Sequence, residues 1–330
     1  MRILRILGLG LVGLGGVVAV LILAAQLRLM WGTASAERSW NEHRVEPLGS
    51  FGSTEAVSIL PLVDWHTSSD SLEGEAGVSY LIRTDDQTIL FDTGFNREER
   101  DPAPLSHNMR GLGLRLGDVD TVFISHLHPD HVGGFRWFRN RTFSIGNTQP
   151  DLSGKRIFVP VPMTYPGSEP VVTGEPTVIG EGVASIGSIP RQLFVDLVEE
   201  QALAIHLRGR GVLLVLGCGH QTLAKVIERA RRVFEEPIYG VIGGLHYPVP
   251  EGRGTLFGVD VQYRLSSGSG PFNPIRQADV EADIERLRQL DLGIVGVGGH
   301  DSSDEVIARF AEVFDERYRH VRVGDEIRLE

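Results

Sequence analysis

The protein has 330 residues, of which 42% are hydrophobic and 23% charged, the balance of an ordinary globular chain with a substantial buried core. Its formal net charge of -11 at pH 7 argues against a nucleic-acid partner, because such binding relies on clustered Lys and Arg. The single cysteine, Cys218, excludes an intramolecular disulfide.

The N-terminal segment, residues 1–32, is predicted to be a membrane anchor or a signal segment. It contains an uncharged run of 22 residues from Ile6 to Leu27, and a helix of that length just spans a hydrocarbon core of about 30 Å. Ala34-Ser35-Ala36 looks like a signal-peptidase site, but a secretory apolar core is usually only about 7–15 residues long, so an uncleaved transmembrane helix is favoured. In either case the remaining chain is expected outside the cytoplasm, anchored to the membrane or, after cleavage, secreted or periplasmic.

The remainder is divided into a linker over residues 33–55 and one catalytic domain over residues 56–330. The linker mixes charge, Gly and Pro without sustained periodicity. In the first half of the domain, short apolar or alternating runs predict strands. The predicted strands are 56–64, a hairpin of 78–83 and 88–92, and 120–125, which leads directly into a cluster of histidines.

The second half of the domain adds helices to this pattern. A hairpin is predicted over 202–207 and 211–216, strands over 238–242 and 293–297, and helices over 222–234, 278–290 and 303–314. The Gly-, Ser- and Pro-rich stretch 249–274 exceeds the roughly 12–15 residues usual for an irregular loop and is interpreted as a lid or substrate loop. Hairpins followed by alternating strands and helices indicate an α/β (α+β) fold in which two sheets pack together with helices outside.

Histidines gather where predicted strands end. They stand in His126-Leu127-His128-Pro129-Asp130-His131, in Gly217-Cys218-Gly219-His220 and in Gly298-Gly299-His300. In extended backbone the side chains at i and i+2 point to the same face, so His126 and His128 can approach one cation together, and Asp130 and His131 can face a second. The other histidines at 43, 66, 107, 206 and 320 are interpreted as ordinary core or surface residues.

The chemistry of the cluster points to a metal. Burying three imidazoles and a carboxylate at a strand end without a cation leaves polar atoms that need partners. Neutral imidazoles and a carboxylate suit Zn²⁺, with iron or manganese as alternatives.

These motifs resemble those of the metallo-β-lactamase superfamily. The run from His126 to His131 matches its HxHxDH motif, Leu90-Phe91-Asp92-Thr93-Gly94 resembles its first motif, and His220 and His300 match its third and last histidines. The resemblance covers about residues 56–329 and implies an αββα sandwich with a metal site at one edge. The Gly-rich motifs that end at His220, His246 and His300 are most similar to the branch typified by dihydropterin ribofuranosyl-aminobenzene phosphate synthase.

The resemblance also implies roles for individual side chains. One metal ion would be held by His126, His128 and His220, and a second by Asp130, His131 and His300. Asp92 would orient the ligands, although the residues alone leave open a simple turn cap. Asp130 and His246 are the candidate catalytic residues: Asp130 would position a metal-activated hydroxide and accept its proton, and His246 would stabilise an oxyanion. Direct contact of His246 with the metal is left open.

The sequence departs from the family pattern at two places. The superfamily commonly supplies a bridging Asp between the third and last histidines, whereas here the corresponding strand ends at His246. In the synthase-like branch the last histidine is usually followed by Cys-Thr-Gly, whereas here Asp301-Ser302-Ser303 follow, and Asp301 is assigned no metal. Cys218, two residues before His220, is interpreted as a small buried core thiol.

We therefore expect a binuclear, zinc-type metal-dependent hydrolase that acts on a small-molecule ester, lactone, amide or phosphodiester. One alternative is a pterin-related synthase or transferase of the same fold, which fits an exported chain poorly. Another is a non-catalytic metal-binding sensor module, which the complete ligand set disfavours. The sequence leaves the oligomeric state open.

Overall fold

Two seven-stranded sheets form the centre of the protein in a computed structural model. The structure describes the backbone of residues 2–194, 196–256 and 258–330. It describes the side chains of residues 20–194, 196–255 and 258–330. The first sheet has the spatial order β18 (Ile327–Leu329), β1 (Val57–Val63), β2 (Ser79–Arg83), β3 (Thr88–Phe91), β4 (Thr121–Phe123), β5 (Arg156–Val159) and β6 (Val171–Val172). The second has the order β17 (Tyr318–His320), β16 (Ile294–Val297), β13 (Ile238–Gly243), β12 (Gly211–Leu216), β11 (Leu203–Leu207), β8 (Val183–Ser185) and β7 (Thr177–Gly180).

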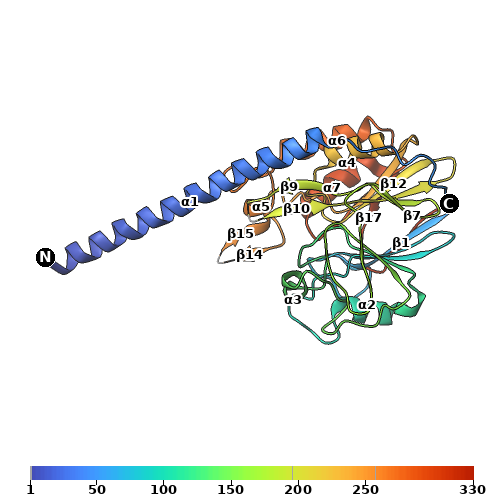
Figure 1. Cartoon of the computed structure of the whole chain (residues 1–330), viewed down its shortest axis with the longest axis horizontal. Coiled ribbons are helices and arrows are strands. Elements are labelled where there is room, and N and C mark those ends of the chain that lie inside the picture. The colour runs from blue at the N-terminus through green and yellow to red at the C-terminus, as the bar shows by residue number, and fades with distance from the viewer. Residues whose placement is uncertain (1, 195, 257) are drawn as a thin grey trace.

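Helices cover the outer face of each sheet (Figure 1). The helices α2 (Pro104–Gly111) and α3 (Phe135–Arg139) lie on the first sheet, and α4 (Leu223–Val233), α6 (Gln277–Arg288) and α7 (Asp304–Phe314) lie on the second. Between the sheets, apolar side chains such as Phe91, Ile205 and Ile242 are fully buried, and each such side chain contributes about 1.5–3 kcal/mol of hydrophobic stabilisation. The predicted arrangement of two packed sheets with helices outside is confirmed.

The predicted elements appear with shifts of one or two residues at their ends. Shorter elements were not predicted, among them the hairpin of β9 (Ile189–Gln192) and β10 (Leu197–Glu200) and the 3-10 helices Leu116–Asp118 and Asp315–Arg317. The stretch 249–274 carries the small hairpin of β14 (Thr255–Leu256) and β15 (Val259–Asp260) and the helix α5 (Val261–Leu265). Asp260 caps α5 by accepting the backbone N–H of Tyr263, as short polar side chains do at helix starts.

The helix α1 (Arg2–Glu42) runs without a break past the predicted linker boundary (Figure 1). Residues 33–42 of the predicted linker are therefore helical. The reason is a helical spacing that the mixed composition conceals: Leu29, Ala36 and Trp40 share one helix face, and all three are buried against the domain. The guanidinium of Arg229 and the ammonium of Lys225 lie 5.1 and 5.3 Å from the centre of the Trp40 ring, which adds cation–π attraction to this contact.

Among the residues whose side chains are described, no helix combines the length and the apolarity that a bilayer crossing requires. Most of the predicted transmembrane segment, residues 6–19, lies outside these described side chains.

Candidate metal centre

The candidate site lies at one edge of the paired sheets, where four loops meet. Strands β12, β13 and β16 are parallel neighbours, so the loops that follow them leave from the same edge. These loops carry His220, His246 and His300, and the loop after β4 of the first sheet carries His126 to His131. The pairing of the strands thus gathers side chains from four distant parts of the chain.

His126, His128 and His220 form the first set of candidate ligands, with ring nitrogens that lie within 4.8 Å of one another. Ser125 Oγ lies 3.0 Å from His126 Nδ1, and Asp196 Oδ2 lies 3.1 Å from His128 Nε2. When these outer nitrogens donate their protons to oxygen, His126 Nε2 and His128 Nδ1 face each other with lone pairs across 3.1 Å. A cation held by both nitrogens would stabilise such an arrangement.

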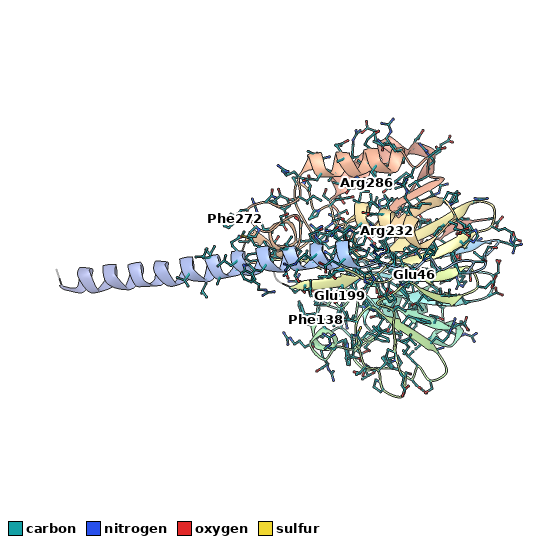
Figure 2. All side chains as sticks on the ribbon, turned by 45° about the horizontal axis from the view of Figure 1, so that its top comes forward. Glu46, Phe138, Glu199, Arg232, Phe272 and Arg286 are labelled. Carbon is teal, nitrogen blue, oxygen red and sulfur yellow. The ribbon has the colours of Figure 1, made fainter. Side chains whose placement is uncertain are left out.

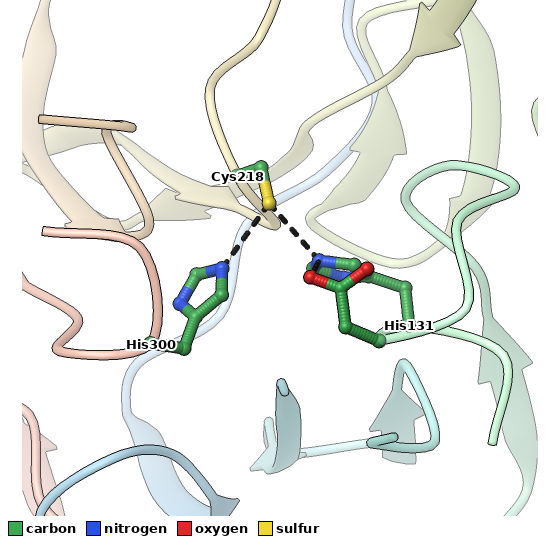
Figure 3. A group of neighbouring side chains, drawn as sticks. His131, Cys218 and His300 are labelled. Carbon is green, nitrogen blue, oxygen red and sulfur yellow. Dashed lines mark hydrogen bonds and ion pairs between the residues drawn. The ribbon is translucent and has the colours of Figure 1, made fainter. Parts of the chain in front are cut away.

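Asp130, His131, Cys218 and His300 form the second set, again with one donor atom each within 4.8 Å of the others. His131 Nε2 lies 3.1 Å and His300 Nε2 lies 3.2 Å from Cys218 Sγ, and Figure 3 shows the sulfur between the two rings. His131 Nε2 lies 3.6 Å from Asp130 Oδ2. The structure therefore brings all six predicted ligands together in the two predicted sets, and adds Cys218 to the second.

The surroundings of Cys218 differ from those of the expected core thiol. The side chain is buried, as predicted, but its sulfur lies among polar side chains at the centre of the site. It forms a third set with His220 and His246. The only sequence signal was its spacing of two residues from His220, because its approach to His131 and His300 depends on how the sheets pack.

Buried nitrogens without hydrogen-bond partners indicate that the donor sets fit a metal ion. Among the described residues, these are His220 Nδ1, His300 Nδ1 and both ring nitrogens of His246. Burial and neighbouring imidazoles lower the pKa of His126 and His220 well below the usual value, and burial lowers the pKa of His300 to about 4. These three rings are therefore neutral at pH 7 and offer lone pairs. Together with a carboxylate and a thiol they suit a divalent ion such as Zn²⁺.

Asp92 is fully buried and holds His131. Its Oδ2 lies 2.7 Å from His131 Nδ1 and accepts a hydrogen bond from Ser125 Oγ at 2.6 Å, and its Oδ1 accepts the Ser125 backbone N–H at 2.7 Å. Burial alone would lower the pKa of His131, but the charges of Asp130 and Asp92 and the hydrogen bond to Asp92 raise it to about 9. This geometry suits a ligand-orienting residue better than a turn cap.

Glu200, at the end of β10, fixes the loop that carries Cys218 and His220, a role that sequence reasoning missed. Its Oε1 accepts the backbone N–H groups of Cys218 and Gly219 at 2.8 Å each, and its Oε2 accepts that of His220 at 2.7 Å. Burial raises the pKa of Glu200 to about 7 against the effect of these hydrogen bonds. No motif could have identified Glu200, because the contact joins two loops through the fold.

Two further buried carboxylates hold the loops around His246 and His300. Asp301 Oδ2 accepts the backbone N–H of His246 at 3.0 Å and lies 3.4 Å from His300 Nε2. Asp64 Oδ1 accepts the backbone N–H of Gly299 at 2.7 Å. Asp301, to which the sequence assigned no metal, is therefore part of the site, because the fold buries it between the two histidines.

His246 lies at the boundary between the donor sets and a pocket. Its ring centre is 4.3 Å from that of His220, and its Nδ1 is 3.7 Å from Asp301 Oδ2. The residues that line the pocket include His220, His246, Arg191, Tyr247 and residues 266–268 of the predicted lid. A substrate in this pocket would lie beside both histidines.

The remaining histidines lie outside the three donor sets found among the described residues, as predicted. His206 Nδ1 is 2.7 Å from the carbonyl oxygen of Gly52, and His43 Nε2 is 3.0 Å from Glu175 Oε2. These rings have ordinary structural partners.

Comparison with known proteins agrees with this geometry. A family model described as the metallo-beta-lactamase superfamily matches residues 72–234. The 7,8-dihydropterin-6-methyl-4-(beta-D-ribofuranosyl)-aminobenzene-5'-phosphate synthase of Methanocaldococcus jannaschii is 22% identical over 244 residues, which cover 60% of this chain and 80% of the relative. The crystal structure of Tm1679, a metal-dependent hydrolase of the beta-lactamase superfamily, shares 20% identity at a TM-score of 0.53 and covers 83% of this chain and 98% of its own.

A shorter match adds a second kind of relative. The N-acyl homoserine lactonase AiiB of Agrobacterium fabrum is 37% identical over 79 residues, which are 18% of this chain and 29% of that protein. The two packed sheets with helices outside form an αββα sandwich. The chain belongs to the metallo-β-lactamase superfamily.

Proposed function

We propose that the protein is a metal-dependent hydrolase that cleaves an ester, lactone, amide or phosphodiester bond in a small substrate. The observation that carries the proposal is the convergence of two donor sets beside a pocket that His220 and His246 line. Membership of a superfamily with many metal-dependent hydrolases supports it.

Asp130 and His246 have different roles in the proposed hydrolysis. Divalent ions in such sites lower the pKa of water toward neutrality and polarise a carbonyl or phosphoryl oxygen. Asp130 is 25% exposed, whereas His131 beside it is fully buried, so its carboxylate is positioned to orient an attacking water and accept its proton. His246, with unpartnered ring nitrogens at the pocket, is positioned to stabilise negative charge on the reacting oxygen.

Arg191 favours a substrate that carries negative charge. It lies on β9 and lines the same pocket. Its Nη2 donates a hydrogen bond to the carbonyl oxygen of Gly268 at 2.8 Å. In the described part of the chain no carboxylate lies within ion-pair distance of this guanidinium, and the charge of Glu37 acts on it from farther away. Arginine binds carboxylate and phosphate oxygens in a bidentate manner, so we favour a phosphodiester or an ester with an acidic group over a neutral lactone.

A pterin-related synthase is the second candidate, because one relative carries that activity in its name. Similarity of 22% supports the shared fold and leaves the reaction to the site. Neutral lactones are kept as a third substrate class because of the short match to a lactonase.

The test is a substrate panel on the zinc-loaded protein, with chromogenic phosphodiester, carboxylic ester, lactone and β-lactam substrates and a pterin precursor. We expect turnover of the phosphodiester or the acidic ester. Arg191→Met should raise KM for the charged substrate about tenfold, the equivalent of about 1.4 kcal/mol, with a smaller effect on a neutral lactone. The exposed Arg115→Met is the control. Absence of hydrolysis of every substrate by folded, metal-loaded protein would contradict the proposal.

We also propose that α1 tethers the protein to a membrane with the catalytic domain outside the cytoplasm. Support comes from exposed apolar side chains on the described part of α1, which include Val20, Leu23 and Trp31, and from the long helix that leaves the domain in Figure 2. Phe272 of the predicted lid is 77% exposed, and nearby Gly270 approaches Leu29 of α1. An apolar tether next to the lid would place the pocket near the bilayer surface.

Membrane fractionation tests the tether. The full chain should sediment with membranes, and a chain that lacks residues 1–27 should be released while it keeps Leu29, Ala36 and Trp40 in place. A full chain that remains in the soluble fraction would exclude the tether without affecting the proposed hydrolysis.

A further inference from the structure

We propose that Cys218 is a metal ligand of the second donor set, and that its sulfur also faces His220 and His246 of the third set. This inference rests on the proposed metal centre and assigns a ligand atom to it. It replaces the interpretation of Cys218 as a core thiol.

The position of the sulfur is the first argument. Sγ lies 3.1 Å from His131 Nε2 and 3.2 Å from His300 Nε2, and it belongs to one set with Asp130 and to another with His220 and His246. His131 donates a hydrogen bond from Nδ1 to Asp92 at 2.7 Å, which turns its Nε2 toward Sγ. The sulfur is thus surrounded by donor atoms.

The unpartnered nitrogens of neighbouring rings are an independent argument. His246 is 7% exposed, and neither of its ring nitrogens has a hydrogen-bond partner among the described residues. His220 Nδ1 and His300 Nδ1 are likewise buried without partners. A thiol has one proton and can satisfy one acceptor, so hydrogen bonding by Cys218 leaves several buried acceptors unpaired. A cation held by Sγ, His220 and His246, which offer one donor atom each within 4.8 Å of the others, would satisfy the ring nitrogens that face it.

The backbone around Cys218 is built to hold the sulfur in this place. Glu200 accepts three consecutive N–H groups from Cys218 to His220. Gly219 has a φ of 75°, and a side chain on Gly217 would collide with Ser125 Oγ. Glu200 thus fixes Cys218 in the same loop as the proposed ligand His220.

Thiolate ligation has chemical consequences. As the metal binds, the S–H proton is released to solvent and the sulfur–metal bond forms, so no oxidant or reductant is needed. The second set then offers two negative charges, from Asp130 and Cys218. A thiolate favours zinc over manganese or magnesium, which narrows the choice of metal that the histidines leave open.

X-ray absorption at the zinc edge of the wild-type holoprotein is the direct test. We expect a sulfur neighbour at about 2.3 Å beside nitrogen and oxygen neighbours at about 2.0–2.2 Å. Because the chain has one cysteine, a thiolate distance is assigned to Cys218 without mutation. A shell of nitrogen and oxygen neighbours alone would overturn the proposal and leave the hydrolase proposal standing.

Cobalt substitution gives a second readout that does not depend on activity. Wild-type protein with bound Co²⁺ should show the intense near-ultraviolet charge-transfer band of a cobalt thiolate, and folded Cys218→Ser should lose the band and bind metal at least tenfold more weakly. Retention of the band and of full affinity in Cys218→Ser would also overturn the assignment. If Cys218→Ser does not fold, the zinc–sulfur distance measured in the wild-type protein is sufficient to test the assignment. A protein with a sulfur neighbour but no hydrolytic turnover would separate this inference from the proposed function.

Discussion

His131 Nδ1 lies 2.7 Å from Asp92 Oδ2, although 39 residues separate the two along the chain. Asp92 lies directly after β3 and His131 in the loop after β4, and the two strands are parallel neighbours. The sheet therefore places an orienting carboxylate behind a candidate metal ligand, which fixes the ring so that its Nε2 faces the site.

Asp92→Asn should weaken metal binding about 10- to 100-fold, the range observed when a partner behind a ligand is removed. The amide keeps the size of the carboxylate but removes the charge that stabilises His131. Competition with a chromophoric chelator measures the affinity. Asp118→Asn is the control, because Asp118 is exposed and pairs with Arg115 at the surface. Equal affinities of Asp92→Asn and the wild type would show that Asp92 has no orienting role.

Asp130→Asn should retain the fold, lose metal from the second set and lower turnover by about 100-fold or more. Asp301→Asn is unsuitable as the control because Asp301 is buried against His246 and His300. Asp291→Asn serves instead, since the Asp291 side chain is 99% exposed and its φ of 50° is one that Asn also adopts. Metal content and turnover on folded protein are measured together. Unchanged metal content with lost turnover would restrict Asp130 to proton transfer.

Glu200→Gln should destabilise the loop that carries Cys218 and His220. The single amide oxygen cannot accept three N–H groups, and its NH₂ would face one of them, so one buried donor loses its partner at a cost of about 1–3 kcal/mol. Denaturant unfolding of metal-free protein measures the loss, and metal titration should show weaker binding in both sets. Glu199→Gln is the matched neighbour, whose carboxylate accepts one side-chain hydrogen bond among the described residues, from Ser188 Oγ at 3.2 Å. Equal stability of the two variants would contradict the role of Glu200.

Asp64 should make the metal-free protein less stable as the pH rises. Burial raises the pKa of Asp64 from 3.8 to about 7, so between these values the folded state binds a proton that the unfolded state has released. The stabilisation from that proton is fully present below pH 3.8 and is lost as the pH rises through about 7.

Asp64→Asn removes this titration while its amide oxygen still accepts the Gly299 N–H. The stability difference, variant minus wild type, should therefore grow from pH 5 to pH 8 by at most about 3 kcal/mol. Unfolding curves of protein treated with a metal chelator measure this difference across the pH range. Because the variant is compared with the wild type, the contributions of other titrating groups cancel. A difference that is constant with pH would show that Asp64 is ionised throughout.

The order of strands and helices in the domain could be predicted from the sequence because periodicity and turn residues are local. The run from His126 to His131 is local in the same sense: one strand end and one turn present four candidate donors. Helix α1 beyond residue 32 was missed, since its buried face, with Leu29, Ala36 and Trp40, stabilises the helix only through packing on the domain.

The arrangement of the site was decided by the tertiary structure. Cys218 and His300 are 82 residues apart and Asp64 and Gly299 are 235 residues apart, yet each pair lies within 3.2 Å. No local preference encodes such contacts, because they require two sheets to close on a common core and parallel strands to end at one edge. The residue types of the metal centre could therefore be predicted from the sequence. The packing of the two sheets decides where Cys218 lies among them, and it places the carboxylates of Glu200, Asp301 and Asp64 behind them.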